Sequence, residues 1–187
     1  ATRIVDKYPE QVFRAEYLKS LFPDAKFLFA VRNGWDACYS IAKWSQRHST
    51  GQYHQLDDWW GRNRRKWTLL LQPVATYDPD LGPYAQEMVG WRDQAHMAAV
   101  EYVLSMREGL SVLARYPSDT LLVSYEALCA RPVEQARSIC NFAHLSNDTT
   151  LLRFAEDVLR PATHYAPFRL NEPIRRAFEM TLGELGY

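Results

Sequence analysis

Arg32 and Ser40 are two residues whose types and spacing fit the binding of an anion in this 187-residue chain. Arg32 ends an apolar run, and Ser40 lies eight residues later, about one turn inside a predicted helix. An arginine fork, a serine hydroxyl, free backbone N–H groups and the helix dipole are able to converge on one phosphate. The alternative is structural: Arg32 pairs with Asp36, and Ser40 bonds to its own helix backbone.

The elements that position these residues follow an alternating pattern. Compact apolar runs at 26–31 and 120–123 predict parallel strands that are buried on both faces, and a short strand is predicted at 2–6. Helical spacing of apolar residues predicts helices near 13–22, 36–48, 91–115, 132–143, 149–158 and 173–186. This order predicts an α/β fold, three-layered around a central parallel sheet.

The carboxyl ends of the predicted strands carry the candidate site. Ligands of parallel sheets bind beyond these ends, near the N-termini of helices. Lys7, Arg32 and Tyr125 follow the three predicted strands. The alternative for Lys7 is a solvated lysine, and for Tyr125 a side chain that faces the core. Loops are expected to lead from each residue into the next helix.

We expect a single domain over 1–187, with a lid or acceptor-site insertion at about 49–90. This stretch is rich in glycine and proline, and its tryptophans and basic residues are interleaved. The tryptophans either shape an acceptor pocket or form the core face of a helix. The basic residues either meet an anionic acceptor or form a solvated helix face. These residues are Trp59, Trp60 and Trp67, with Arg62, Arg64, Arg65 and Lys66.

Composition limits the classes of function. The net charge is zero, which argues against a dedicated DNA-coating protein, and no nucleic-acid partner is expected. Residues 1–70 nevertheless hold 12 basic and 7 acidic side chains, so an anion is expected to bind there. No apolar run is long enough to span a membrane. Cys38, Cys129 and Cys140 lack metal-ligand spacing and are expected as buried thiols in the cytoplasm.

The order of several motifs resembles the central segment of the sulfotransferase family. A Lys-x-Pro turn precedes a predicted helix, a Phe-Pro-x-Ala-Lys-Phe strand follows, and Arg, Asp and Ser come next at the family's spacing. A later strand ends in Tyr-Glu-x-Leu before a proline, and the close of the chain is similar to that of many bacterial members. These residues are Lys7-Tyr8-Pro9, Phe22 to Phe27, Arg32, Asp36, Ser40, Tyr125 to Leu128, Arg131-Pro132 and Leu185-Gly186-Tyr187.

The resemblance implies a P-loop NTPase-like fold and a donor, 3′-phosphoadenosine-5′-phosphosulfate (PAPS). It implies that Arg32 and Ser40 hold the 3′-phosphate of the nucleotide and that Tyr125 lies near the adenine. Lys7 matches the family's lysine near the point of sulfuryl transfer, and it is the catalytic candidate. The product is adenosine 3′,5′-bisphosphate (PAP), and no metal is required. The acceptor is a hydroxyl or amine of a small molecule, a glycan or a lipid-like alcohol.

One family element is missing from the 187 residues. The Gly- and Ser-rich loop that holds the 5′-phosphosulfate has no counterpart here, and no glycine precedes Gly34. We expect this element upstream of Ala1. Two other functions therefore stay open: a sulfotransferase-like protein that binds a nucleotide or glycan without turnover, and a P-loop nucleotide kinase. The kinase would need a Walker-type loop and Mg²⁺ ligands, which the sequence does not show.

Overall fold

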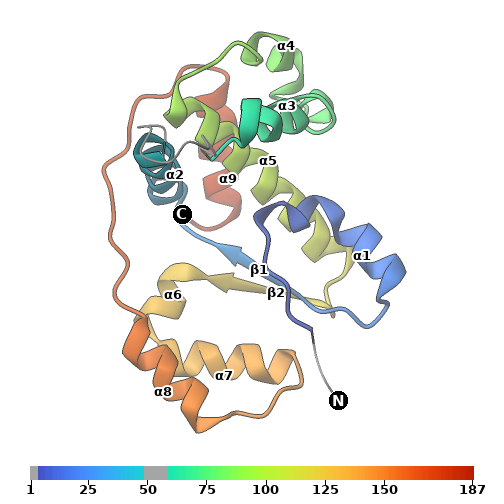
Figure 1. The fold of residues 1–187 in the computed structure, drawn as a ribbon, viewed down its shortest axis with the longest axis vertical. Coiled ribbons are helices and arrows are strands. Elements are labelled where there is room, and N and C mark those ends of the chain that lie inside the picture. The colour runs from blue at the N-terminus through green and yellow to red at the C-terminus, as the bar shows by residue number, and fades with distance from the viewer. Residues whose placement is uncertain (1–3, 49–58) are drawn as a thin grey trace. The chain divides into compact units, whose positions relative to one another are not determined.

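The computed structural model describes residues 4–48 and 59–187 (Figure 1). The chain divides into two compact units. Unit 1 comprises Ala1–Val31 and Arg107–Ala162, and unit 2 comprises Arg32–Met106 and Thr163–Tyr187. The single domain over 1–187 remains a prediction.

Helices dominate the described residues, and two short strands form the sheet. The strands are β1 (Phe27–Val31) and β2 (Thr120–Ser124). The helices are α1 (Ala15–Leu21), α2 (Gly34–His48), α3 (Arg65–Leu71), α4 (Ala85–Met88), α5 (Gln94–Arg115), α6 (Tyr125–Ala130), α7 (Pro132–Phe142), α8 (Thr149–Val158) and α9 (Ile174–Glu184).

The sheet of unit 1 confirms the predicted parallel pairing. β1 and β2 run side by side, with Phe27 opposite Thr120 and Val31 opposite Ser124 (Figure 1). The fold is therefore a mixed α/β fold with a small two-stranded parallel sheet among the described residues. The strands predicted at 26–31 and 120–123 are confirmed within one residue.

The predicted strand at 2–6 is wrong for its described part, residues 4–6, which have irregular backbone. Ile4 and Val5 are 92% and 85% exposed, so their branched side chains have no sheet face to pack against. A strand forms only where a neighbouring strand accepts and donates its backbone hydrogen bonds. The local pattern predicted the strand propensity but not the partner.

β2 also ends differently from the prediction. It passes directly into α6, and no loop separates them. The hydroxyl of Ser124 accepts a hydrogen bond of 3.2 Å from the amide of Ala127, which caps the helix at its first turn. Tyr125 is consequently the first residue of a helix.

Helix α5 packs closely against β1 in unit 1, and Gly109 makes this approach possible. A Cβ atom at Gly109 would lie 2.1 Å from the ring of Phe29, whose side chain is buried. Any larger residue at this position would force the ring or the helix to move. The glycine therefore determines how near the helix lies to the sheet.

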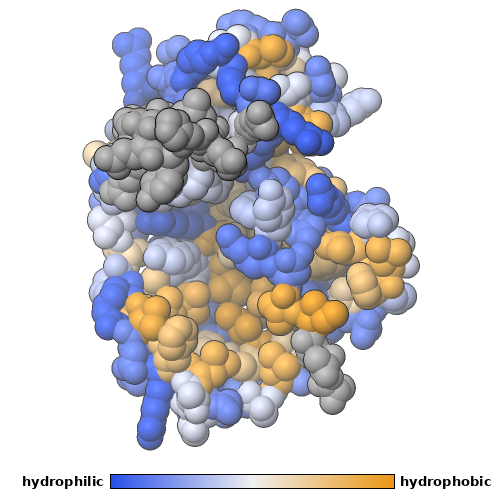
Figure 2. Space-filling model, in the orientation of Figure 1, coloured by the Kyte–Doolittle hydropathy of each residue, from blue (hydrophilic) through white to orange (hydrophobic). Residues whose placement is uncertain are grey.

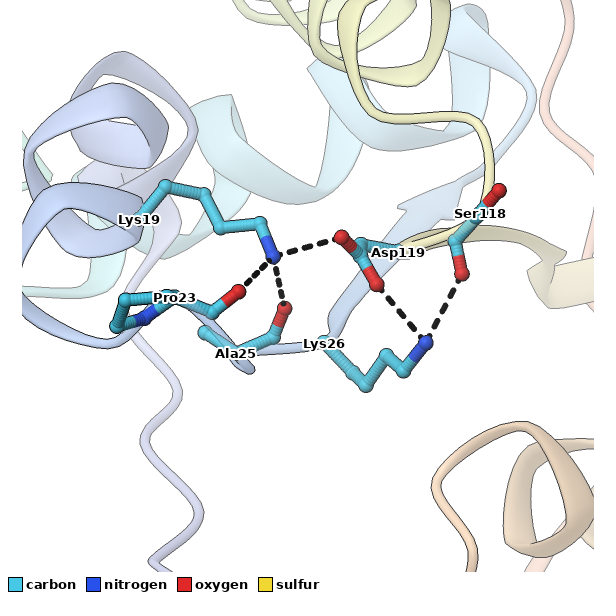
Figure 3. Close-up of polar contacts among 6 residues, drawn as sticks. All are labelled: Lys19, Pro23, Ala25, Lys26, Ser118 and Asp119. Carbon is cyan, nitrogen blue, oxygen red and sulfur yellow. Dashed lines mark hydrogen bonds and ion pairs between the residues drawn. The ribbon is translucent and has the colours of Figure 1, made fainter.

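The start of the sheet is tied to α1 by two lysines and one carboxylate (Figure 3). Lys19 Nζ lies 2.7 Å from Asp119 Oδ2, and Lys26 Nζ lies 2.9 Å from Asp119 Oδ1. Lys26 also donates to the carbonyl of Ser118 over 3.0 Å. The hydrogen bonds that Lys19 and Lys26 donate to the carboxylate lower the pKa of Asp119 to about 2. Lys26, which belongs to the family motif, thus has a structural role in joining β1 to β2.

Several large apolar side chains of unit 1 remain exposed. Leu28 of β1 is 48% exposed and Leu122 of β2 is 38% exposed. Figure 2 shows apolar surface around the two strands and over α1. On α8, Leu151, Phe154 and Val158 are exposed at helical spacing, while Leu152 and Ala155 face the interior with Ala136 of α7.

Unit 2 has a core in which tryptophans are central. Trp60 and Trp67 are 0% and 1% exposed, and their rings meet edge to face at 5.3 Å. Their indole N–H groups donate to Gln94 Oε1 over 2.6 Å and to the carbonyl of Met88 over 3.1 Å. The structural alternative, the core face of a helix, is therefore confirmed for Trp67 of α3, whereas Trp60 is buried in the core but lies in a turn. Of the predicted insertion at 49–90, residues 49–58 lie outside the described residues.

All three cysteines are free and buried, as predicted. Burial, and secondly the carboxylate of Glu101, raise the pKa of the Cys38 thiol well above its usual value. Over residues 4–48 and 59–187, no helix combines the length and the apolar character that a membrane crossing requires.

Candidate functional site

Asn33 caps the helix that carries the candidate phosphate site. Its side-chain oxygen accepts hydrogen bonds from the amides of Trp35, over 3.0 Å, and of Asp36, over 3.4 Å. The amide of Ala37 donates to the carbonyl of Asn33 over 3.0 Å. Two of the N–H groups expected to help bind the anion at the start of α2 thus already donate to Asn33, and anion binding at this helix start stays a prediction.

The backbone around Arg32 is held by an aromatic pair from α5 and α9. A Cβ atom at Gly34 would lie 2.7 Å from Phe178 and 2.9 Å from Tyr102, so only glycine lets α2 begin here. The hydroxyl of Tyr102 donates to the carbonyl oxygen of Arg32 over 2.9 Å. The backbone at half-buried Arg32 is thus held within unit 2 by packing and by a hydrogen bond.

Asp36 anchors the segment that precedes α9. Its carboxylate is 1% exposed, and it accepts a hydrogen bond of 2.7 Å from the amide of Tyr165. Its second oxygen lies 2.8 Å from Nδ1 of His164. Among the residues that the structure describes, the partners of this carboxylate thus come from the segment 163–170. The alternative, an ion pair between Arg32 and Asp36, is not among these contacts.

Ser40 is exposed on the same face of α2, one helical turn after Asp36. The ring of Tyr39 beside it stacks on Tyr165, with centroids 3.9 Å apart and planes 19° from parallel. Lys43 lies one turn further, with Nζ 5.3 Å from the centroid of Tyr39. The face therefore presents a hydroxyl and an ammonium group beside an ordered aromatic pair.

A pocket opens next to this helix within unit 2. It has a volume of about 500 Å³ and is lined by Trp35, Phe168, Arg169 and Glu172, among others. Trp35 meets Phe168 edge to face at 5.1 Å, which forms its aromatic wall. Two charged residues of the lining are already paired, since Arg175 Nη2 lies 2.5 Å from Glu172 Oε1.

The other two predicted site residues belong to unit 1. Lys7 is exposed and precedes the 3-10 turn Pro9–Arg14, which starts with a proline. Tyr125 is half-buried at the start of α6. Arg32 and Ser40 thus both belong to unit 2, and Lys7 and Tyr125 both belong to unit 1.

Two of the four basic residues proposed for an anionic acceptor have intramolecular roles. Arg64 donates to the carbonyl oxygens of Val89 and Trp91. Lys66 Nζ lies 2.6 Å from Oε1 of Glu101 and 4.1 Å from the centroid of Trp59. With side chains 16% and 8% exposed, Lys66 and Glu101 form a largely buried ion pair that joins α3 to α5.

The sequence reasoning missed His164, Tyr165 and Tyr39 as parts of this site. His164 is separated from Asp36 by 128 positions, and no spacing rule links residues so far apart. Two signals were available. The resemblance implies that the loop at 160–169 closes over the 3′-phosphate, without naming His164 or Tyr165, and Asp36, Tyr39 and Ser40 are related by i, i+3 and i+4 on a predicted helix. That relation indicates a shared face but not what covers it.

Comparison with known proteins confirms the resemblance inferred from the motifs. The model of the sulfotransferase family matches residues 1–81, which include Lys7, Arg32 and Ser40 but not Tyr125. No curated protein matches the chain.

A solved structure, the sulfotransferase domain from the curacin biosynthetic pathway, is similar in fold with a TM-score of 0.57 and 15% identity. The match covers 96% of this chain and 59% of that one. The chain thus has a sulfotransferase-like fold and spans about three fifths of that relative.

Proposed function

We propose that the chain is part of a PAPS-dependent sulfotransferase. The observation that carries the proposal is the site on α2. Arg32 and Ser40 lie at the family's spacing, in the segment that matches the family model. Arg32 stands two residues before α2 and Ser40 stands on it, and the start of this helix is fixed by Gly34 and Tyr102. An exposed hydroxyl and a half-buried guanidinium fit a phosphate group.

In this proposal the site on α2 binds the 3′-phosphate of the donor. That contact distinguishes PAPS from ATP, which carries a hydroxyl at the same position. In the transfer, the acceptor oxygen forms a bond to sulfur while the bond from sulfur to the bridging oxygen of the nucleotide breaks. The acceptor's proton passes to a base, and adenosine 3′,5′-bisphosphate leaves.

Lys7 is proposed to stabilise the negative charge that develops on the bridging oxygen. Tyr125 is proposed to lie against the adenine. Both roles come from the motif spacing. The acceptor is proposed to be a hydroxyl or amine.

Isothermal titration calorimetry tests the proposal with two ligands that differ by one group. Adenosine 3′,5′-bisphosphate should bind more tightly than adenosine 5′-monophosphate, which lacks the 3′-phosphate. Equal affinity for the two nucleotides would refute the site. Preference for the bisphosphate without sulfuryl transfer to any acceptor would favour the non-catalytic binding protein instead.

A further inference from the structure

His96, in the first turn of α5, contacts two groups of unit 2 through its two ring nitrogens. Nδ1 lies 2.9 Å from Oδ1 of Asp93, which also accepts from the amide of His96 over 2.8 Å. Nε2 accepts a hydrogen bond of 3.2 Å from the amide of Asn171, in the segment before α9. The side chain of His96 is only 16% exposed, so the ring is held between these two groups.

The two contacts determine where the ring carries its proton. An amide N–H only donates, so Nε2 must keep its lone pair to accept from Asn171. A carboxylate only accepts, so Nδ1 must carry a proton toward Asp93. The bond to Asn171 therefore requires a neutral His96 with its proton on Nδ1. Protonation of Nε2 would place one N–H group against another and break this bond.

The carboxylate of Asp93 favours this protonation. Partial burial raises the pKa of Asp93, but hydrogen bonds from the amide and the ring of His96 outweigh it, and the pKa lies below its usual value. An ionised carboxylate stabilises a doubly protonated imidazole beside it. The two contacts of the ring thus make opposite demands on its charge. Histidine is the side chain that ordinarily changes charge between about pH 5 and 8.

Other charged side chains near the ring have partners of their own. These are Arg64 and Arg92, which donate to the carbonyl of Trp91, and Arg175, which lies 2.5 Å from Glu172. The indole of Trp91 meets the ring of His96 edge to face at 5.9 Å. Within the described residues, the ion pair of the protonated ring is therefore the one with Asp93.

The same segment has a second histidine at its other end, and this one is expected to respond to acid in the opposite way. Nδ1 of His164 lies 2.8 Å from Oδ2 of Asp36. Protonation of His164 adds a charge to this pair and strengthens it. The amide of Tyr165 also donates to Asp36, over 2.7 Å. Acid should therefore retain the attachment of the segment to α2 and weaken its attachment to α5.

We propose that His96 is a pH-sensitive attachment of the segment before α9. The neutral ring holds Asn171 at the start of α5, and the doubly protonated ring releases it. Leu170, Asn171 and Glu172 belong to the lining of the pocket of about 500 Å³ in unit 2. The charge of one ring thus controls how firmly one wall of this pocket is held. The proposal is independent of the proposed function, because its test needs no nucleotide.

Hydrogen exchange of two backbone amides tests the proposal on the intact protein. Protection factors, corrected at each pH for the intrinsic exchange rate, are measured between about pH 5.5 and 8. The amide of Asn171 should lose about 2- to 10-fold of its protection as His96 becomes doubly protonated, which is the effect of one lost hydrogen bond. The amide of Tyr165 is the internal control and should keep its protection, because its acceptor is the carboxylate of Asp36.

Nitrogen NMR of the histidine rings gives the second readout. At about pH 8 the spectrum should show a proton on Nδ1 of His96 and a lone pair on Nε2. On acidification, Nε2 should gain a proton. The midpoint of this titration should coincide with the pH at which the amide of Asn171 has lost half of the protection that it loses in total.

Two substitutions separate the charge of the ring from the position of its nitrogens. In His96→Gln, the amide oxygen reaches the position of Nε2 and does not titrate, so the protection of Asn171 should persist over the whole pH range. In His96→Asn, the shorter amide reaches only the position of Nδ1, so protection should be low throughout. His164→Gln, the matched change at the other histidine of the segment, should leave the pH dependence at Asn171 unchanged.

Several results would overturn the proposal, and each is obtained from the wild type. A proton on Nε2 of His96 at about pH 8 excludes the bond to Asn171. A ring that stays neutral over the whole range, or one that titrates while the protection of Asn171 is unchanged, excludes the pH-sensitive attachment. An equal loss of protection at Tyr165 and Asn171 indicates general loosening of the segment in acid, without a specific role of His96.

Discussion

The hydroxyl of Tyr102 donates a hydrogen bond of 2.9 Å to the carbonyl oxygen of Arg32. Tyr102 lies in the middle of α5, and Arg32 is the first residue after β1. The bond satisfies a backbone acceptor at the point where the chain turns from strand to helix. It therefore holds the backbone of the residue that the proposed function assigns to the phosphate.

Replacing Tyr102 by phenylalanine removes this bond and retains the ring that packs on Phe178. Tyr102→Phe should lower the free energy of unfolding by about 0.5–1.5 kcal/mol, the usual contribution of one hydrogen bond. Urea denaturation measures the change. Tyr77→Phe is the control, because Tyr77 is 85% exposed, and it should leave the midpoint unchanged. Equal effects of the two changes would contradict the role of the bond.

Arg32→Ala should weaken nucleotide binding far more than it affects folding. Loss of a charge-assisted phosphate contact of about 1.5–3 kcal/mol corresponds to a donor KM raised about 10- to 150-fold. Steady-state kinetics at varied PAPS concentration would measure it, with thermal melting to confirm folding. Arg153→Ala, at an exposed position of α8, serves as the control. A normal donor KM in Arg32→Ala would disprove the assignment.

The close approach of Gly109 to Phe29 predicts opposite effects of two Gly→Ala changes. Alanine is the better helix former by about 1 kcal/mol, but at Gly109 its Cβ would lie 2.1 Å from the buried ring. Gly109→Ala should therefore destabilise the protein by about 1–3 kcal/mol. At Gly183 of α9 nothing lies within 4 Å, so Gly183→Ala should be neutral or stabilising. The free energies of unfolding of the two variants, measured by chemical denaturation, test this difference.

The Lys19–Asp119–Lys26 cluster predicts a loss of stability in acid. The pKa of Asp119 is lowered from 3.8 to about 2 by hydrogen bonds from Lys19 and then Lys26. A group whose pKa is depressed in the folded state stabilises it above the unfolded value, and this contribution is lost as the pH falls. Stability contributed by Asp119 should thus be complete above about pH 5 and disappear between about pH 4 and 2.

Denaturation of wild type and Asp119→Asn between pH 2 and 7 checks this expectation. The difference between the two proteins should be largest at neutral pH and shrink toward pH 2. Lys26→Met should shift the titration of Asp119 upward, as seen by NMR of the carboxyl carbon. A difference that stays constant with pH would show that the cluster does not couple to folding.

The buried cysteines predict low thiol reactivity. Cys38, Cys129 and Cys140 are 0%, 6% and 1% exposed, and the raised pKa of Cys38 further suppresses its thiolate. Ellman's reagent should react slowly with the native protein. In denaturant, where the thiols are exposed, it should react rapidly with all three. Rapid reaction of Cys38 in the native state would contradict its placement.

Local patterns predicted much of this structure, and contacts between distant residues account for what they missed. β1, α2 and α8 were predictable because apolar spacing and caps act within a few residues. Strand 2–6 was not, because a strand depends on a partner that the sequence does not specify. The contact of Asp36 with His164 joins residues 128 positions apart, so only the fold reveals it.

The motifs have the same limit, because their spacing also covers only residues that are near one another in the sequence. Arg32 and Ser40 could be singled out because they are only eight residues apart at the start of one helix, and the same spacing left the role of Asp36 ambiguous. Lys26 belongs to the motif that pointed to the family, yet it pairs with Asp119 of the second strand. A residue of a family motif can therefore stabilise the sheet instead of binding a ligand.

The division of the chain has a practical consequence for experiments with fragments. Unit 1 is made of two stretches, Ala1–Val31 and Arg107–Ala162, and the first stretch of unit 2 runs between them. No truncation from either end removes one unit and leaves the other whole. A deletion that extends past Val31 from the N-terminus, or past Thr163 from the C-terminus, would therefore damage both units. Excising 32–106 and closing the gap with a short linker is the cut that keeps both stretches of unit 1 in one polypeptide.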